Sequence, residues 1–127
     1  MRMVFAGTCL LAALSVVAHS PAFSQDQKDD APKYTIKDVM KKGQSKGGLY
    51  AKLMMGKASD ADAKTLLEMY QALSKQKPPV GDADSWKMKT TALVEAAQLY
   101  VDGKKDDSQA KLRDAGNCMN CHKAHKG

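Results

Sequence analysis

The sequence has 127 residues, enough for one small domain once any targeting segment is removed. Charged residues make up 27% and hydrophobic residues 43%, a composition typical of a folded globular protein rather than a disordered or membrane-spanning one. The net charge of +6 raises the question of a nucleic-acid partner. Only Arg2 and Arg113 are arginines, and no aromatic residues alternate with the lysines, so the pattern argues against nucleic-acid binding.

Residues 1–24 have the pattern of a secretory signal peptide. Arg2 supplies the positive start, residues 3–18 are apolar, and Ala22 and Ser24 are the small residues that signal cleavage requires. The alternative is a retained single-pass anchor, for which the apolar run is short. Cleavage after Ser24 removes Cys9 and leaves 103 of the 127 residues, with 19 Lys and Arg against 14 Asp and Glu. We therefore predict an exported, periplasmic protein.

Residues 25–33 are rich in Asp, Lys and Gln and lack apolar anchors, which predicts a flexible N-terminal arm before a domain at residues 34–127. The first helix of that domain is expected to begin at the capping pair Thr35 and Asp38 and to end at Gly56. Its stripe of apolar and small residues comprises Ile36, Met40, Gly43, Gly47, Tyr50 and Met54. The glycines predict either a close approach by a bulky group or a break near Gly47.

Two further helices follow, each with a recognisable start. Ser59 and Asp62 form a second capping pair, and Asp82 or Asp84 is expected to cap the third helix. The inward positions are Ala63, Leu66, Leu67, Tyr70 and Leu73 in one helix, and Trp86, Thr90, Leu93, Ala97 and Tyr100 in the other.

A fourth helix is expected to begin at Asp107 or Ser108 and to continue nearly to the end of the chain. Leu112, Ala115 and Met119 are its expected inward residues. No strand pattern is present in the sequence. Four amphipathic helices joined mostly by short connections predict an all-α fold, an antiparallel four-helix bundle.

The chemistry is indicated by the segment Cys118-Met119-Asn120-Cys121-His122, which matches the C-x-x-C-H attachment sequence of c-type haem. Two thiols at positions i and i+3 of a helix lie on one face, where both can form thioethers with the vinyl groups of one porphyrin. The adjacent imidazole of His122 can then reach the iron. We predict one covalent haem c on the C-terminal helix.

Three other interpretations of the cysteines stay open at this point. They are a thioredoxin-like redox pair, a structural disulfide, and a zinc site formed by Cys118, Cys121, His122 and His125. On the haem interpretation His125 is expected to be exposed or to lie on the propionate side of the porphyrin. Lys126 is expected either to neutralise a propionate or to be an ordinary solvated lysine.

A four-helix pattern with C-x-x-C-H in its last helix resembles the class II c-type cytochromes, the cytochrome c′ and cytochrome c556 group, over residues 34–126. The segment Ile36-Lys37-Asp38-Val39-Met40-Lys41-Lys42-Gly43 is similar to the family's first helix, in which a Met at the position of Met40 ligates iron in the c556 type. In the c′ type an apolar residue stands there and the iron is open to small gases. The resemblance therefore implies Met40 as second axial ligand, with core packing as the alternative, and places Gln44 near enough to be a distal hydrogen-bond donor.

The resemblance implies a one-electron carrier, and its alternative is a haem protein that binds or senses nitric oxide or carbon monoxide. A metal-binding structural module without haem is a third interpretation. No paired nucleophile and base, phosphate loop or carboxylate dyad stands out, so an enzyme is not expected and no catalytic residue is assigned. Redox proteins are the expected partners, and no membrane contact is expected after signal cleavage. The relatives can dimerise, which leaves a homodimer open. The lysines of the first helix, which either steer acidic partners or form a solvated face, are Lys37, Lys41, Lys42, Lys46 and Lys52.

Overall fold

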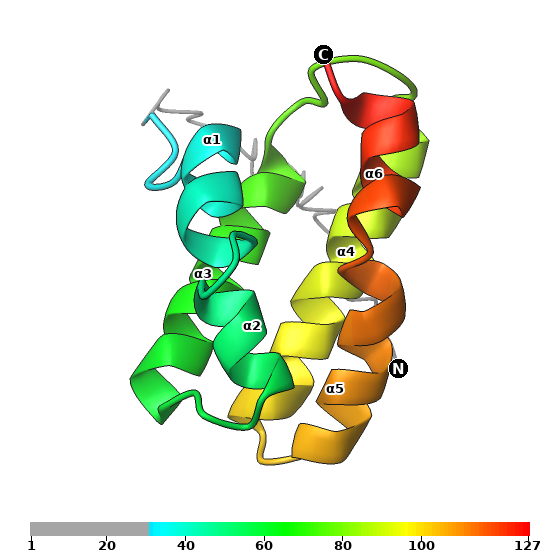
Figure 1. The fold of residues 1–127 in the computed structure, drawn as a ribbon. Coiled ribbons are helices and arrows are strands. Elements are labelled where there is room, and N and C mark those ends of the chain that lie inside the picture. The colour runs from blue at the N-terminus through cyan, green and yellow to red at the C-terminus, as the bar shows by residue number, and fades with distance from the viewer. Residues whose placement is uncertain (1–30) are drawn as a thin grey trace, which may run out of the picture. The chain divides into compact units, whose positions relative to one another are not determined.

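All regular structure in the described part of the chain is helical (Figure 1). The computed structural model describes residues 31–127, and the predicted signal peptide and most of the predicted arm lie outside them. The arm's last residue, Lys33, forms an ion pair with Glu68. The expected all-α class is therefore confirmed for residues 31–127. Within this range, no helix has both the length and the apolar character needed to span a membrane.

The first helical segment is broken where the glycines predicted a break. It consists of α1 (Ile36–Asp38), a wider π-helical turn η1 (Val39–Gly43) and, after five residues outside any helix, α2 (Leu49–Met54). Thr35 and Asp38 form the expected capping box. Gly47 has φ of +78°, a backbone conformation that side chains other than glycine rarely adopt. The predicted break near Gly47 is therefore confirmed, and the segment does not continue as one helix to Gly56.

The two central helices match their predictions. Helix α3 (Asp60–Lys75) begins at the Ser59 capping box, and α4 (Ala83–Val101) begins at Asp82, whose carboxylate accepts a hydrogen bond from the backbone of Ser85 at 2.7 Å. The expected inward residues of α4 are all buried, and so are those of α3 except Leu67, which is half-buried. Local capping and a regular apolar period explain this agreement.

The last helical segment differs from its prediction in its start, its continuity and its orientation. Helix α5 (Lys105–Ala115) begins before Ser108, which is buried and donates to the carbonyl of Ala96 at 2.6 Å. The segment then breaks at Gly116, and α6 (Cys118–His125) starts anew with Asn117 as its cap. This restart turns Met119 outward, where its side chain is 58% exposed, so its expected inward position was wrong.

The core is formed around the central pair of helices. Helix α3 packs along α4, α4 packs along α5 and near α6, and η1 and α2 lie against α3. Successive helical segments run in opposite directions in Figure 1. The largest completely buried apolar side chains are Tyr70, Leu53, Leu66, Leu73, Leu112 and Val39. Burial of these side chains is the main source of stability, since the shorter helices are marginal on their own.

Replacing Leu112 tests the core between α5 and its neighbours. Leu112 is 0% exposed, so Leu112→Ala should lower the free energy of unfolding by about 2–5 kcal/mol, through lost transfer energy and the cavity that remains. Urea unfolding followed by circular dichroism measures this change. The matched control is Met88→Ala in α4, because Met88 is 70% exposed and its loss should change the free energy by less than about 0.5 kcal/mol. Equal effects of the two substitutions would contradict the packing.

Candidate functional site

Helix α6 presents the C-x-x-C-H segment from a newly capped start. The side-chain oxygen of Asn117 accepts a hydrogen bond from the backbone of Met119 at 3.0 Å, which satisfies one of the free amide groups at the helix start. From this start, Cys118 and His122 are exposed and Cys121 is half-buried toward the core. Both cysteines are free thiols, so these residues form no disulfide.

His125 is buried, and its predicted exposure was wrong. Its side chain is 3% exposed, with Nδ1 at 3.0 Å from the carbonyl oxygen of Val80 and Nε2 at 3.2 Å from the hydroxyl of Ser85. Its ring meets Trp86 edge-on, with 5.4 Å between centroids. His125 is buried because of a tertiary contact: the loop between α3 and α4 lies over the end of α6 (Figure 1). Both ring nitrogens of His125 face Val80 and Ser85, which removes this residue from the four-ligand zinc interpretation.

The backbones of the α3–α4 loop and of the end of α6 are also in close contact. Gly81 has φ of +89°, and a Cβ there would collide with the carbonyl oxygen of Ala124. On the other side, Trp86 Nε1 donates to the carbonyl of Gln76 at 2.8 Å, and Gln76 Nε2 donates to the carbonyl of Tyr34 at 2.8 Å. These contacts join the start of the domain, the α3–α4 loop and the end of α6.

One pocket brings together the predicted haem residues from the two ends of the domain. Met40 of η1 and Cys118, Cys121 and His122 of α6 all border it, and its volume is about 200 Å³. Its other lining residues are Gln44, Leu73, Leu93, Ala115, Gly116 and Asn117. The structure therefore places the four predicted site residues around a single, mostly apolar space. Two other methionines of the first helical segment, Met54 and Met55, are not among the lining residues.

Within this pocket, Gln44 forms a polar pair with Tyr70. Gln44 Nε2 lies 2.8 Å from the Tyr70 hydroxyl, while its other amide atom, Oε1, is buried without a hydrogen-bond partner among the described residues. Burial raises the pKa of Tyr70 well above its usual range, with the Tyr50 side chain adding to the effect and the Gln44 hydrogen bond opposing it. The phenol is therefore neutral at physiological pH and keeps its proton.

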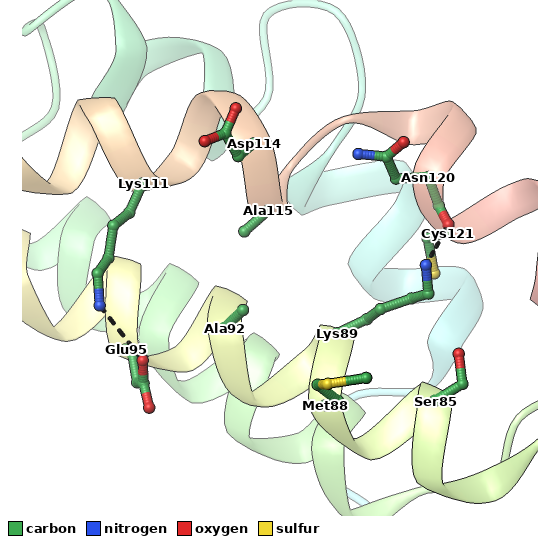
Figure 2. A pocket seen from close by; sticks show the side chains of 10 residues that line it. All are labelled: Ser85, Met88, Lys89, Ala92, Glu95, Lys111, Asp114, Ala115, Asn120 and Cys121. Carbon is green, nitrogen blue, oxygen red and sulfur yellow. Dashed lines mark hydrogen bonds and ion pairs between the residues drawn. The ribbon is translucent and has the colours of Figure 1, made fainter.

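A second, larger pocket shares Cys121 and Ala115 with the first. It holds about 520 Å³ between α4, α5 and α6, and Figure 2 shows its side chains. Lys89 reaches across it to donate to the backbone carbonyl of Asn120 at 2.6 Å, and Lys111 pairs with Glu95 at 3.3 Å. Cys121 therefore borders free space on two sides of α6.

The two thiols differ in environment. Burial raises the pKa of the Cys121 thiol, the nearby Lys89 ammonium lowers it, and the proximity of the Cys118 side chain raises it further. Cys118 is exposed to solvent. At neutral pH, Cys121 is therefore the more protected and less nucleophilic of the two.

The donor set at the first pocket suits a c-type haem. Two free thiols and an imidazole stand on one short helix, and the thioether of Met40 faces the same space from η1. The pocket's volume of about 200 Å³ lies below the roughly 300–1,000 Å³ of small-molecule sites, and the adjoining pocket offers further space beside Cys121. The side chains present are therefore of the kinds that attach and ligate a c-type haem. The free space beside Cys121 is divided between two pockets.

Two contributors to the site were missed by the sequence reasoning. The cap at Asn117 had a local signal, because Asn after Gly116 is typical of one helix ending and another starting. The partnership of Tyr70 with Gln44 had none, since 26 residues separate them. Tyr70 was predicted only as a core residue.

Comparisons with protein-family models, with curated proteins and with solved structures find no match to this chain. Among residues 31–127, no three His, Cys, Asp or Glu side chains converge as a metal-binding group.

Alkylation tests the difference between the thiols. In protein produced without haem attachment, iodoacetamide should modify Cys118 faster than Cys121 at pH 7, because Cys121 is half-buried and has a raised pKa. The difference should narrow as the pH rises and Cys121 ionises. Tandem mass spectrometry of the peptide that contains both cysteines measures the two rates. Unfolding in urea is the control and should bring them together, whereas faster reaction of native Cys121 would contradict the geometry.

Proposed function

We propose that this chain is a monohaem c-type cytochrome that carries one electron at a time. The observation that carries this proposal is the convergence of Met40 with Cys118, Cys121 and His122 on one pocket, although 78 positions separate Met40 from the first of the cysteines. A bound haem supplies the one-electron chemistry. The protein supplies attachment, axial ligands and a dry environment.

Each residue has a defined role in this proposal. Cys118 and Cys121 would hold the group covalently, and His122 would offer its imidazole to the iron. Met40 would offer a thioether from η1, and such a ligand raises a haem's reduction potential. The apolar side chains of the lining, which include Leu73 and Leu93, keep water from the pocket.

The fold proposed for this function is an antiparallel four-helix bundle with haem on its C-terminal helix. Its first member is the broken segment at residues 36–54, α3 and α4 are its central members, and the broken segment at residues 105–125 is its last. The alternating directions in Figure 1 and the packing of α3 on α4 and of α4 on α5 support this description. Pocket residues lie next to both breaks: Gln44 follows η1, and Cys118 begins α6.

Export and partner binding complete the proposal. The predicted signal peptide, residues 1–24, would deliver the chain to the periplasm, where haem attachment takes place in the resembled family. The first-helix lysines are all exposed, which suits steering of acidic redox proteins, and Lys52 also pairs with Asp62 at 3.5 Å. A homodimer would be compatible with these roles.

A second candidate function is binding of a small gas at an open iron position. The observation that favours it is the unpaired amide oxygen of Gln44 in the pocket, since buried polar atoms ordinarily have partners. Carbon monoxide distinguishes the two functions. An electron carrier with Met40 bound should respond weakly to it, and an open site should respond strongly.

Removal of both thiols tests attachment. Cys118→Ala combined with Cys121→Ala should abolish covalent haem, because no thioether can form. The measurement is haem staining after denaturing electrophoresis of protein matured with a haem-attachment system. Cys9→Ala is the matched control and should leave attachment unchanged. Haem that stays with the double variant through denaturation would refute the attachment site.

Replacement of Met40 tests the second axial ligand. Met40→Ala should keep haem attached, remove the sulfur-to-iron charge-transfer band, lower the reduction potential and make the reduced protein respond to carbon monoxide. Absorption spectroscopy and redox titration measure these changes. Met55→Ala is the control, since Met55 is 58% exposed. An unchanged spectrum in the Met40 variant would remove Met40 from the iron and favour the open site.

A further inference from the structure

Gln44 and Tyr70 form a polar pair at the edge of the otherwise mostly apolar pocket. Gln44 follows Met40 by four positions, about one helical turn, and both residues border the pocket. Tyr70 is 0% exposed, and the two side chains meet at 2.8 Å. A buried carboxamide in an otherwise apolar lining is costly unless its atoms are paired.

In this orientation of the Gln44 amide, donors and acceptors of the pair are not all matched. With Nε2 of Gln44 donating to the Tyr70 oxygen, the Tyr70 hydroxyl hydrogen reaches no acceptor among the described residues, and Gln44 Oε1 also has no partner. Buried tyrosine hydroxyls usually donate a hydrogen bond. This orientation of the amide therefore leaves two polar groups unpaired.

Rotation of the amide by half a turn pairs these two groups with each other and leaves only the amide NH₂ without a partner. The nitrogen and oxygen of a carboxamide have nearly the same shape, so their assignment depends on the hydrogen-bond network. In the rotated form the Tyr70 hydroxyl donates to Gln44 Oε1. The amide NH₂ of Gln44 then occupies the unpaired position with its hydrogens free.

We propose that Gln44, oriented by Tyr70, donates a hydrogen bond to a small ligand bound in this pocket, and that it thereby selects ligands whose outer atom accepts one. The inference rests on the proposed haem site, because Met40 and His122 border the same space. Nitric oxide and cyanide belong to the selected class, and carbon monoxide, a poor acceptor, does not.

The rest of the lining leaves this role to Gln44. No Lys, Arg, Asp or Glu side chain is among the lining residues, and His122 is assigned to the iron. Asn117 is exposed to solvent, and its side-chain oxygen caps α6. Gln44 is the lining residue whose amide is held at the pocket by a buried partner, Tyr70.

The test uses matured protein with Met40→Ala, so that the iron position is open whether or not Met40 ligates. Adding Gln44→Leu should weaken cyanide binding to the oxidised form roughly two- to tenfold, the value of one net hydrogen bond, with a smaller effect on carbon monoxide. The infrared C–O stretch of the carbon monoxide complex should rise, because a donor near the outer atom lowers it. Tyr70→Phe should give a partial change of the same sign, and Gln71→Leu, an exposed glutamine of α3, should give none.

The contrary outcomes are separable. A C–O stretch that is unchanged or lower in the Gln44→Leu variant, with haem normally attached, overturns the inference and leaves the proposed function intact. Absence of covalent haem overturns the proposed function. The amide orientation is tested separately by NMR of the full chain, where Tyr70→Phe should hardly move the Gln44 side-chain NH₂ resonances. A large shift would show that the NH₂ already donates to Tyr70, which contradicts the inference.

Discussion

The anchoring of one buried imidazole positions the segment on which the proposed chemistry depends. Helix α6 has eight residues, too few to be stable alone, and the break at Gly116 separates it from α5. His125 fixes its far end against Val80, Ser85 and Trp86. With Asn117 capping one end and His125 buried at the other, the rotation of α6 about its axis is determined. Cys121 then faces the core while Cys118 stays in solvent.

The opposite wall of the pocket depends on a different constraint, the close approach of η1 to α3. A Cβ on Gly43 would lie 3.4 Å from Leu66, so the backbone of η1 is near enough for ordinary contact with α3. The π-helical turn adds a residue to the ladder at this point, and such turns are frequent at functional sites. Met40 and Gln44 leave the backbone at the two ends of this turn, which places both of them on the pocket.

Features with local causes were predictable from the sequence, and features with tertiary causes were not. The capping boxes at Thr35 and Ser59 and the spacing of Cys118 and Cys121 act within one helical turn, so these two helix starts and the C-x-x-C-H segment were found. The burial of His125 depends on a loop about 45 positions earlier, and the pairing of Tyr70 depends on a turn 26 positions away. Hydrophobic periodicity also predicted that the fourth helix continues past Gly116. The pattern of apolar residues does not reveal that one helix ends there and that the next begins with a different rotation about its axis.

Both candidate functions use the side of the pocket formed by Met40 and Gln44. Which function is favoured depends on whether the Met40 sulfur binds the iron. If Met40 binds iron, a ligand must displace Met40 before it meets the amide of Gln44. The apparent affinity of that ligand is then its affinity for an open site multiplied by the fraction of molecules in which the site is open. At an open fraction of about 1%, that affinity is about a hundredfold weaker than at an open site. The hydrogen bond from Gln44 recovers roughly two- to tenfold of this loss for an acceptor ligand and little for carbon monoxide. On this proposal the Met40 thioether sets the overall affinity for ligands, and the amide of Gln44 sets which ligands compete best.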